Sequence, residues 1–438
     1  MKSTLKILSV LLLLLLGSQA YSQQYWLSMN SPVKLHLKRA CFLDSNNGWI
    51  CGDSGLIMKT TNGGQNWIRQ NTRINYLIHD IFFINKRLGW ALSWNIFNPN
   101  PPYGTFVLKT TDGGANWDTT HFPSENVYIR TVYFQDSLYG FMGGTFRNIM
   151  RTTDGGANWL DVQIDSLLVM YFPVNNFTFY SNNYGYASGG QMDFAGVVWR
   201  TTDRGARWTP ALVAAEPTWN VYFLDSLRVI GMTGDFEYGP SLINTTNAGA
   251  SWKYTYLGLF GFPSEMAYRT NYDAWTPLGF SQRFMHSIDS GYTWVEVETP
   301  DSAVVNHVIF TDSMHGYAVC EDGKILKYNS AVIGIGNNTS EVPDKFLLNQ
   351  NYPNPFNPLT NITYELKSNS YVLLDIYDIN GRFVRKLYDG YQNSGKYKLK
   401  FDGGNLSSGV YFYRITVRDL TGKSNEFKTE TKKMLLVK

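Results

Sequence analysis

The chain has 438 residues, of which 44% are hydrophobic, 16% aromatic and 17% charged, so it can bury a large core and is not a disordered polypeptide. The formal net charge is +3, with 21 Lys and Arg against 25 Asp and Glu in residues 23–339, and 15 against 10 in residues 340–438. This distribution contains no basic stripe, which argues against a nucleic-acid partner. The 13 tryptophans, 29 tyrosines and 39 glycines favour an all-β protein.

Residues 1–22 have the pattern of a secretory signal peptide. Two lysines give a positive start, residues 7–16 form an apolar run, and Ala20 and Ser22 offer small side chains for cleavage. The apolar run is too short to cross a hydrocarbon core of about 30 Å as a helix. We therefore expect an exported mature chain that begins near Gln23 and has no transmembrane segment after signal removal.

One octapeptide recurs six times, in copies such as TTNGGQNW at 60–67 and TTDGGANW at 110–117. A short Asp or Asn side chain can accept backbone N–H bonds across a tight turn, Gly supplies the positive φ, and Trp anchors the turn in the core. We therefore predict a structural role, and not a catalytic one, for each acidic or amide residue and its Trp. The six pairs are Asn62 with Trp67, Asp112 with Trp117, Asp154 with Trp159, Asp203 with Trp208, Asn247 with Trp252, and Asp289 with Trp294.

A second motif lies between these boxes, as in FLDSNNGW at 42–49 and FTDSMHGY at 310–317. Alternating apolar residues on both sides of its turn predict a β-hairpin, so each repeat supplies four strands. Four strands per repeat of about 40 to 45 residues are typical of a propeller blade. Six full repeats and two half repeats predict seven blades, the last completed by a strand that begins at Trp26 and hides the open edges.

This repeat resembles the Asp-box propellers of the sialidase type and, more closely, the photosystem II assembly factor family. The stretch GWICGDSGLIMKTTNGGQNW at 48–67 carries the likeness, which extends over roughly residues 25–330. The resemblance implies a seven-bladed β-propeller over residues 23–330 with a binding or assembly role. The resemblance does not imply that this chain has the photosynthetic partner of that family, because its C-terminal region indicates a different cellular location.

Residues 331–345 have the Gly, Asn and Ser content of a linker, and a new pattern follows over residues 346–438. Its blocks include NQNYPNPFNPLTNITYEL at 349–366 and GKYKLKFDGGNLSSGVYFYRI at 395–415. They resemble the type A sorting domain of the type IX secretion system, and the alternating strands and Gly turns predict a small immunoglobulin-like β-sandwich. The resemblance implies that residues 346–438 engage the type IX machinery. It also implies release from, or display on, the outer surface of a Gram-negative relative of the Bacteroidetes, by way of the periplasm.

The propeller face opposite the box turns is the predicted ligand-binding face. It collects the connections between second and third strands and the starts of the first strands, of which the connection at 94–104 is the longest. Such loops on a rigid scaffold carry function in many folds, and this face mixes aromatics with charges, which suits a glycan or protein ligand. The candidate residues are Trp94, Tyr103, Arg130, Phe146, Arg147, Asp193, Trp219, Phe236, Glu237, Tyr238 and Arg283.

The sequence contains no HExxH, GxSxG or phosphate-binding Gly loop, and its three cysteines lack a zinc spacing. We therefore predict no catalytic residue, no metal and no cofactor, and favour a binding or scaffold protein. A glycoside hydrolase of sialidase-like fold is the first alternative, with Asp193 and Glu237 among its possible acids. An assembly factor for an outer-membrane or extracellular complex is the second alternative.

The cysteines leave two disulfide pairings open in an exported protein. Cys41 and Cys51 flank one hairpin and are expected to lie nearly opposite each other. Cys51 with Cys320, across the closure of the ring, is the rival pairing. One thiol stays unpaired in either case.

Overall fold

The structure is a computed structural model. It describes residues 24–96, 100–145, 147–166, 169, 171–331, 346–368, 370–392, 395–404, 406–419 and 427–438. The predicted signal peptide, and all but the first residue of the predicted linker, lie outside these residues. Strands make up 55% of the described residues and helices 2%, which confirms the all-β prediction.

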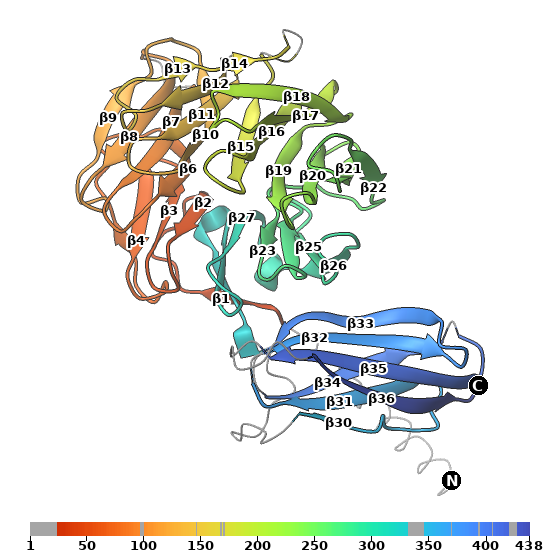
Figure 1. The fold of residues 1–438 in the computed structure, drawn as a ribbon. Helices are drawn as coiled ribbons and strands as arrows, with labels where there is room; N and C mark the ends of the chain where they lie inside the picture. Colours follow the sequence, from red (N-terminus) through yellow and green to blue (C-terminus); the bar gives the residue numbers. More distant parts are fainter. Residues whose placement is uncertain are drawn as a thin grey trace, which may run out of the picture. The chain divides into compact units, whose positions relative to one another are not determined.

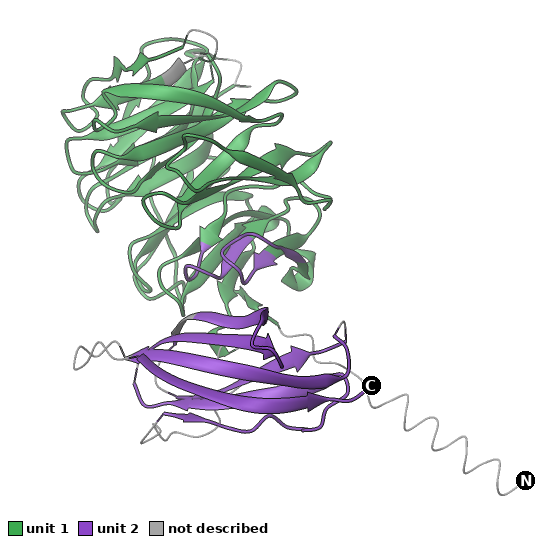
Figure 2. Ribbon diagram, turned by 45° about the vertical axis from the view of Figure 1, so that its right-hand side comes forward, with its two compact units in different colours: residues 1–267, 276–285, 296–332 green, residues 268–275, 286–295, 333–438 purple. Residues whose placement is uncertain are grey.

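The chain divides into two compact units (Figure 2). The first unit comprises residues 1–267, 276–285 and 296–332, and the second comprises residues 268–275, 286–295 and 333–438.

Before residue 330, the described strands form seven sheets, which follow one another around a common centre in Figure 1. The first three sheets are β2 (Leu37–Phe42), β3 (Gly48–Gly52), β4 (Leu56–Thr60), β5 (Ile68–Arg69); β6 (Leu77–Phe83), β7 (Gly89–Asn95), β8 (Gly104–Thr110), β9 (Asp118–His121); and β10 (Tyr128–Phe134), β11 (Gly140–Thr145), β12 (Arg147–Thr152), β13 (Leu160–Asp161). The fourth sheet is β15 (Val174–Phe179), β16 (Gly185–Gln191), β17 (Ala195–Thr201), β18 (Arg207–Ala214), with β14 (Gln163–Ile164) beside β18.

The remaining three sheets of this series complete the pattern. They are β19 (Thr218–Phe223), β20 (Val229–Asp235), β21 (Gly239–Thr245), β22 (Lys253–Tyr256); β23 (Ala267–Tyr268), β24 (Ala274–Pro277), β25 (Arg283–Ser287), β26 (Val295–Glu298); and β27 (Val305–Phe310), β28 (Gly316–Cys320), β29 (Ile325–Tyr328), β1 (Trp26–Met29). Two short 3-10 helices, η1 (Pro300–Ser302) and η2 (Glu321–Gly323), accompany the last sheet. The number of blades in the ring stays a prediction from the repeats.

The N-terminal strand joins the last strand, as the sequence predicts. Strand β1 pairs antiparallel with β29, so that Trp26 lies opposite Tyr328. Trp26 is 1% exposed and its ring packs on Phe284, Phe310 and Tyr328 at centroid distances of 5.0, 5.6 and 5.5 Å. The outer edge of that sheet is therefore covered by a strand from the other end of the propeller sequence.

The second motif of the repeat forms the first hairpin of a sheet. In the β2–β3 hairpin, the Asp44 carboxylate accepts the backbone N–H groups of Asn46 and Asn47 at 2.9 and 2.8 Å. A Cβ on Gly48 would lie 2.4 Å from the ring of Phe42, so this position requires glycine. The same Gly and Phe contact recurs in four other sheets, at Gly89 with Phe83, Gly140 with Phe134, Gly185 with Phe179, and Gly316 with Phe310.

Aromatic stacking joins consecutive sheets. Trp49 of the β2–β5 sheet stacks on Phe83 of the next sheet with ring centroids 3.7 Å apart. Tyr317 of the last sheet stacks on Phe42 of the first at 3.9 Å. The aromatic residue after the motif glycine of one sheet therefore packs on the motif Phe of the next.

The box turns have the same hydrogen bonds in every copy. At the second box, the Thr110 hydroxyl accepts the N–H of Gly114 at 2.9 Å, and Asp112 accepts the N–H of Asn116 at 2.9 Å. The backbone N–H of Asn116, followed by the Asn116 side chain and the Thr110 hydroxyl, lowers the pKa of Asp112 to about 2. Asn62 accepts the N–H of Asn66 at 2.9 Å in the first box, so an amide serves as well as a carboxylate.

The last strands form two sheets around one apolar core. The sheets are β30 (Leu347–Leu348), β31 (Leu359–Leu366), β34 (Gly395–Asp402), and β33 (Phe383–Gln392), β32 (Ser370–Asp378), β35 (Gly409–Asp419), β36 (Phe427–Leu436). Residues from both sheets, among them Ile362, Phe401, Ile376 and Ile415, are fully buried together. This arrangement is consistent with the predicted β-sandwich.

The two predicted disulfide pairings are corrected by the structure. Cys41, Cys51 and Cys320 are all free thiols. In the β2–β3 ladder, Cys41 lies opposite Trp49 and Cys51 lies opposite Arg39, so the two cysteines are diagonal neighbours and not a directly opposed pair.

Candidate functional site

Two tight connections place acidic and aromatic side chains at one end of neighbouring sheets. Strand β16 ends at Gln191, β17 begins at Ala195, and Asp193 between them has a positive φ of 60°. Strand β20 ends at Asp235, whose carboxylate accepts the N–H groups of Glu237 and Tyr238 at 2.9 and 2.8 Å. Such short side chains stabilise tight turns by bonding to the backbone that follows.

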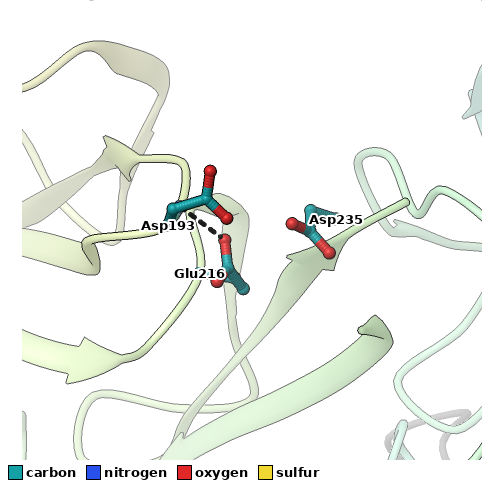
Figure 3. Close-up of side chains that lie close together, drawn as sticks. All are labelled: Asp193, Glu216 and Asp235. Atoms are coloured by element: carbon teal, nitrogen blue, oxygen red, sulfur yellow. Dashed lines mark hydrogen bonds between the residues drawn. The ribbon is translucent and has the colours of Figure 1, made fainter. Parts of the chain in front are cut away.

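Three carboxylates meet between these connections (Figure 3). Asp193, Glu216 and Asp235 each offer an oxygen within 4.8 Å of the others, and the N–H of Asp193 donates to Glu216 at 3.1 Å. Asp235 is 1% exposed and Glu216 is 7% exposed, whereas Asp193 is exposed. Burial, with the nearby charge of Asp235, raises the pKa of Glu216. The negative charges of Glu237 and its neighbours raise the pKa of Tyr238.

Exposed aromatic side chains lie in and next to the connections that carry these carboxylates. The exposed aromatics are Phe194, Phe236, Tyr238, Phe260 and Phe280, with exposed fractions of 76, 56, 54, 69 and 55%. Gly239 lies against the carbonyl of Leu259, which sets the segment of Phe260 beside the β20–β21 connection. Phe260 in turn contacts Phe280 with ring centroids 6.5 Å apart. We call these five aromatics, with Asp193, Glu216, Asp235 and Glu237, the aromatic–acidic arc.

The arc contains four of the predicted ligand-binding residues. Asp193, Phe236, Glu237 and Tyr238 all belong to it. A fifth predicted residue, Trp219, is half-buried. Its indole N–H donates to the carbonyl of Gly234, which directly precedes Asp235, at 2.8 Å.

Three other predicted residues lie further along the ring. Trp94 is half-buried, packs against His79 with ring centroids 3.9 Å apart, and donates its indole N–H to the carbonyl of Ile129 at 2.7 Å. Arg130 donates to Asn175 at 2.9 Å, and Tyr103 is half-buried. These side chains already have partners within the fold.

The last three predicted residues are Arg283, Phe146 and Arg147. Arg283 forms an ion pair with Glu296 of β26, the last strand of its sheet. Phe146 lies outside the described residues, and Arg147 is described only as the first residue of β12.

Sequence reasoning missed Glu216 and Phe260. Glu216 lies two residues before the first strand of its sheet, and that place among the first-strand starts was the available signal. Phe260 lies between two sheets in an uncharged segment, LGLFGFPS at 257–264, whose pattern gave no sign of exposure.

A second buried charged group lies among the first strands. Arg39 of β2 is paired with Asp80 of β6 at 2.8 Å and with Glu265, which also accepts a hydrogen bond from Asn176 at 2.9 Å. Burial raises the pKa of Asp80. All of these groups are satisfied by one another, so we assign them a structural role.

Among the described residues, Asp193, Glu216 and Asp235 are the one group of three potential metal-ligating side chains that approach one another closely. No helix in the described part of the chain is long and apolar enough to cross a membrane.

Two family models match the chain. Residues 350–427 match the Secretion system C-terminal sorting domain, and residues 18–124 match the Photosynthesis system II assembly factor YCF48. A search of curated proteins gave no match. The sorting domain indicates secretion to the cell surface or the extracellular space of Bacteroidetes-type bacteria.

Several solved propellers are similar in structure. YCF48 bound to D1 peptide is 20% identical, with a TM-score of 0.56 over 70% of this chain and 97% of that chain. YCF48 from Cyanidioschyzon merolae is 20% identical, with a TM-score of 0.55 over 70% and 99%. Virginiamycin B lyase from Staphylococcus aureus is 12% identical, with a TM-score of 0.55 over 69% and 98%. The chain therefore has a β-propeller fold and carries a secretion sorting domain.

Proposed function

We propose that this protein is an extracellular binding module that holds a macromolecular ligand on the aromatic–acidic arc. The observation that carries the proposal is the exposure of five aromatic side chains, each more than half exposed, in and next to the connections that carry the three carboxylates. A soluble protein rarely leaves such a group of apolar side chains in water unless the group contacts a partner. The rigid sheets below hold the loops in place, as in other binding scaffolds.

A likeness in fold supports a macromolecular ligand. YCF48, a propeller of similar fold, has been solved with a bound peptide. The pattern of aromatics with carboxylates here suits a peptide or glycan more than a small apolar molecule. A role as assembly factor for an outer-membrane or extracellular complex is the same activity with a protein as ligand.

Glycan hydrolysis is the second candidate, and the acidic group favours it. A retaining glycosidase places its two carboxyl groups about 5 Å apart, with one pKa raised for the general acid. The oxygens of Asp193 and Glu216 lie within 4.8 Å, and the pKa of Glu216 is raised by burial. Loss of a measured glycan turnover in Glu216→Gln would establish this candidate.

We further propose that residues 346–438 bind the type IX machinery and direct the passage across the outer membrane. Deleting these residues in the producing bacterium should leave the propeller in the periplasm. A carrier protein with a signal peptide at its N-terminus and residues 346–438 at its C-terminus should be exported to the cell surface or the medium. A deleted protein that still reaches the medium at the normal level would contradict this role.

The binding function is tested with the full mature chain on arrays of glycans and peptides, followed by an activity assay on each hit. Phe236→Ala should weaken binding, since this ring lies within the arc. Leu227→Ala is a matched control, because Leu227 is 55% exposed, close to the 56% of Phe236, and precedes the opposite end of strand β20. Binding that is unaffected by Phe236→Ala would remove the arc from the function.

A further inference from the structure

We propose that the ligand of the arc is a cationic, extended segment of a partner protein, with one arginine or lysine side chain seated among Asp193, Glu216 and Asp235. This inference rests on the proposed binding function and names its ligand class. A neutral or acidic glycan and a small metal ion are the competing occupants.

The charge of the connections selects a cation. Residues 190–196, 214–218 and 234–240 contain four carboxylates and no Lys, Arg or His. Three of these carboxylates lie within 4.8 Å of one another, and two of the three are at least nine-tenths buried. Like charges at this distance and burial repel strongly, and a guanidinium or ammonium group relieves that repulsion, whereas sugar hydroxyls leave it uncompensated.

The aromatic side chains require a ligand larger than an ion. Phe194 follows Asp193 directly and contacts Phe172 with ring centroids 6.0 Å apart, which places apolar surface on one side of the acids. Phe260 and Phe280, in contact with each other, extend it past Gly239 on the other side. A segment of several residues can cover both sides, and the faces of Phe236 and Tyr238 can receive further cationic side chains by cation–π contact.

The acidic group is held in place before any ligand arrives. Asp235 accepts two backbone N–H groups of its own turn, and Glu216 accepts the N–H of Asp193. These bonds hold the carboxylates of Asp235 and Glu216, and the bond to Glu216 also ties it to the backbone of Asp193. A partner therefore loses little free energy in ordering the site, which favours specific binding.

The probe is a labelled synthetic peptide of alternating Arg and Tyr with Gly spacers, and its twin has citrulline in place of each Arg. Binding to the full mature protein is measured by fluorescence anisotropy in low and high salt. The arginine peptide should bind at least about tenfold more tightly than its twin, and high salt should weaken it. The double variant Asp193→Asn with Glu237→Gln, both exposed residues, should lose at least about tenfold in affinity.

Phe236→Ala should lose about tenfold as well, while Leu227→Ala should bind like the wild type. Equal binding of the two peptides, or no binding of either, overturns the inference. Capture of a neutral glycan that depends on Phe236 would overturn the cationic segment and leave the binding function standing. If no array ligand depends on Phe236, the inference and the proposed function both fail.

Discussion

Arg39 of strand β2 holds Glu265 through both of its terminal guanidinium nitrogens, although 226 residues separate the two in the chain. The same guanidinium pairs with Asp80, which is 2% exposed. Burial acts to lower the pKa of Arg39, but the charges of Glu265 and Asp80 outweigh it and raise that pKa. One cation thus compensates two carboxylates from two other parts of the ring.

Replacing Arg39 should destabilise the propeller strongly. Arg39→Gln leaves Asp80 and Glu265 with no cation, and breaking a buried ion pair from one side costs about 3 to 5 kcal/mol. Denaturant unfolding of the full mature chain measures this loss. The matched control is Arg87→Gln on an exposed turn, which should change the free energy of unfolding by less than about 0.5 kcal/mol. Equal stability of the two variants would show that the buried charges contribute nothing.

Because strand β1 completes the last sheet, we expect replacement of Trp26 to lower the free energy of unfolding strongly. Its indole is 1% exposed against three aromatic rings, so Trp26→Ala should cost about 3 to 5 kcal/mol. Leu27 lies next to it and is 42% exposed, so Leu27→Ala should cost less than about 1 kcal/mol. Unfolding curves of the two variants test this contrast. A mild, local effect of Trp26→Ala would argue that the ring is stable without its N-terminal strand.

The box carboxylates predict acid-sensitive stability. The pKa of Asp112 and of Asp154 is lowered to about 2, mainly by the N–H groups of Asn116 and Asn158, against about 3.9 in an unfolded chain. A lowered pKa contributes stability that is present above the unfolded value and is lost as the pH falls through the folded value. The double variant Asp112→Asn with Asp154→Asn keeps the amide acceptor seen at Asn62.

At low salt, the stability of the wild type should therefore exceed that of this variant above about pH 4, and the difference should vanish near pH 2. Urea unfolding at a series of pH values gives the comparison. A difference that does not change with pH would contradict the account.

The raised pKa of Glu216 predicts a pH dependence of stability that is opposite in sign to that of the box carboxylates. Burial raises its pKa, so the ionised side chain is disfavoured in the fold. Its contribution to stability is fully present below the unfolded value of about 4.3 and is lost as the pH rises through the folded value. Glu216→Gln should therefore raise the Tm at pH 7 and have no effect near pH 4. Glu237→Gln, at an exposed neighbour, should leave the Tm unchanged at both. A lower Tm for Glu216→Gln at pH 7 would contradict this prediction.

Periodic patterns made the fold readable from the sequence. The second motif predicts the hairpin of β2 and β3, and the box predicts the backbone N–H bond to Asp112. The spacing also predicted that the strand of Trp26 completes the last sheet. Each of these rests on local chemistry repeated many times.

The site depends on contacts that no repeat encodes. Glu216 reaches Asp193 and Asp235 only because the fold brings the segment before β19 next to the β16–β17 and β20–β21 connections. Arg283 was predicted for the ligand face from its place in a loop, and no repeat encodes the ion pair that it forms with Glu296. The Cys41 and Cys51 pairing failed because the hairpin register sets Arg39, and not Cys41, opposite Cys51.

The most direct test of the account is site-specific photo-crosslinking in the producing bacterium. One protein carries the photoreactive amino acid in place of Phe236, and the other carries it in place of Leu227, which has almost the same exposure and precedes the opposite end of β20. We predict a discrete cross-linked partner protein from position 236 and none from position 227. The same partner from both positions, or a partner from position 227 alone, would contradict a binding function of the aromatic–acidic arc.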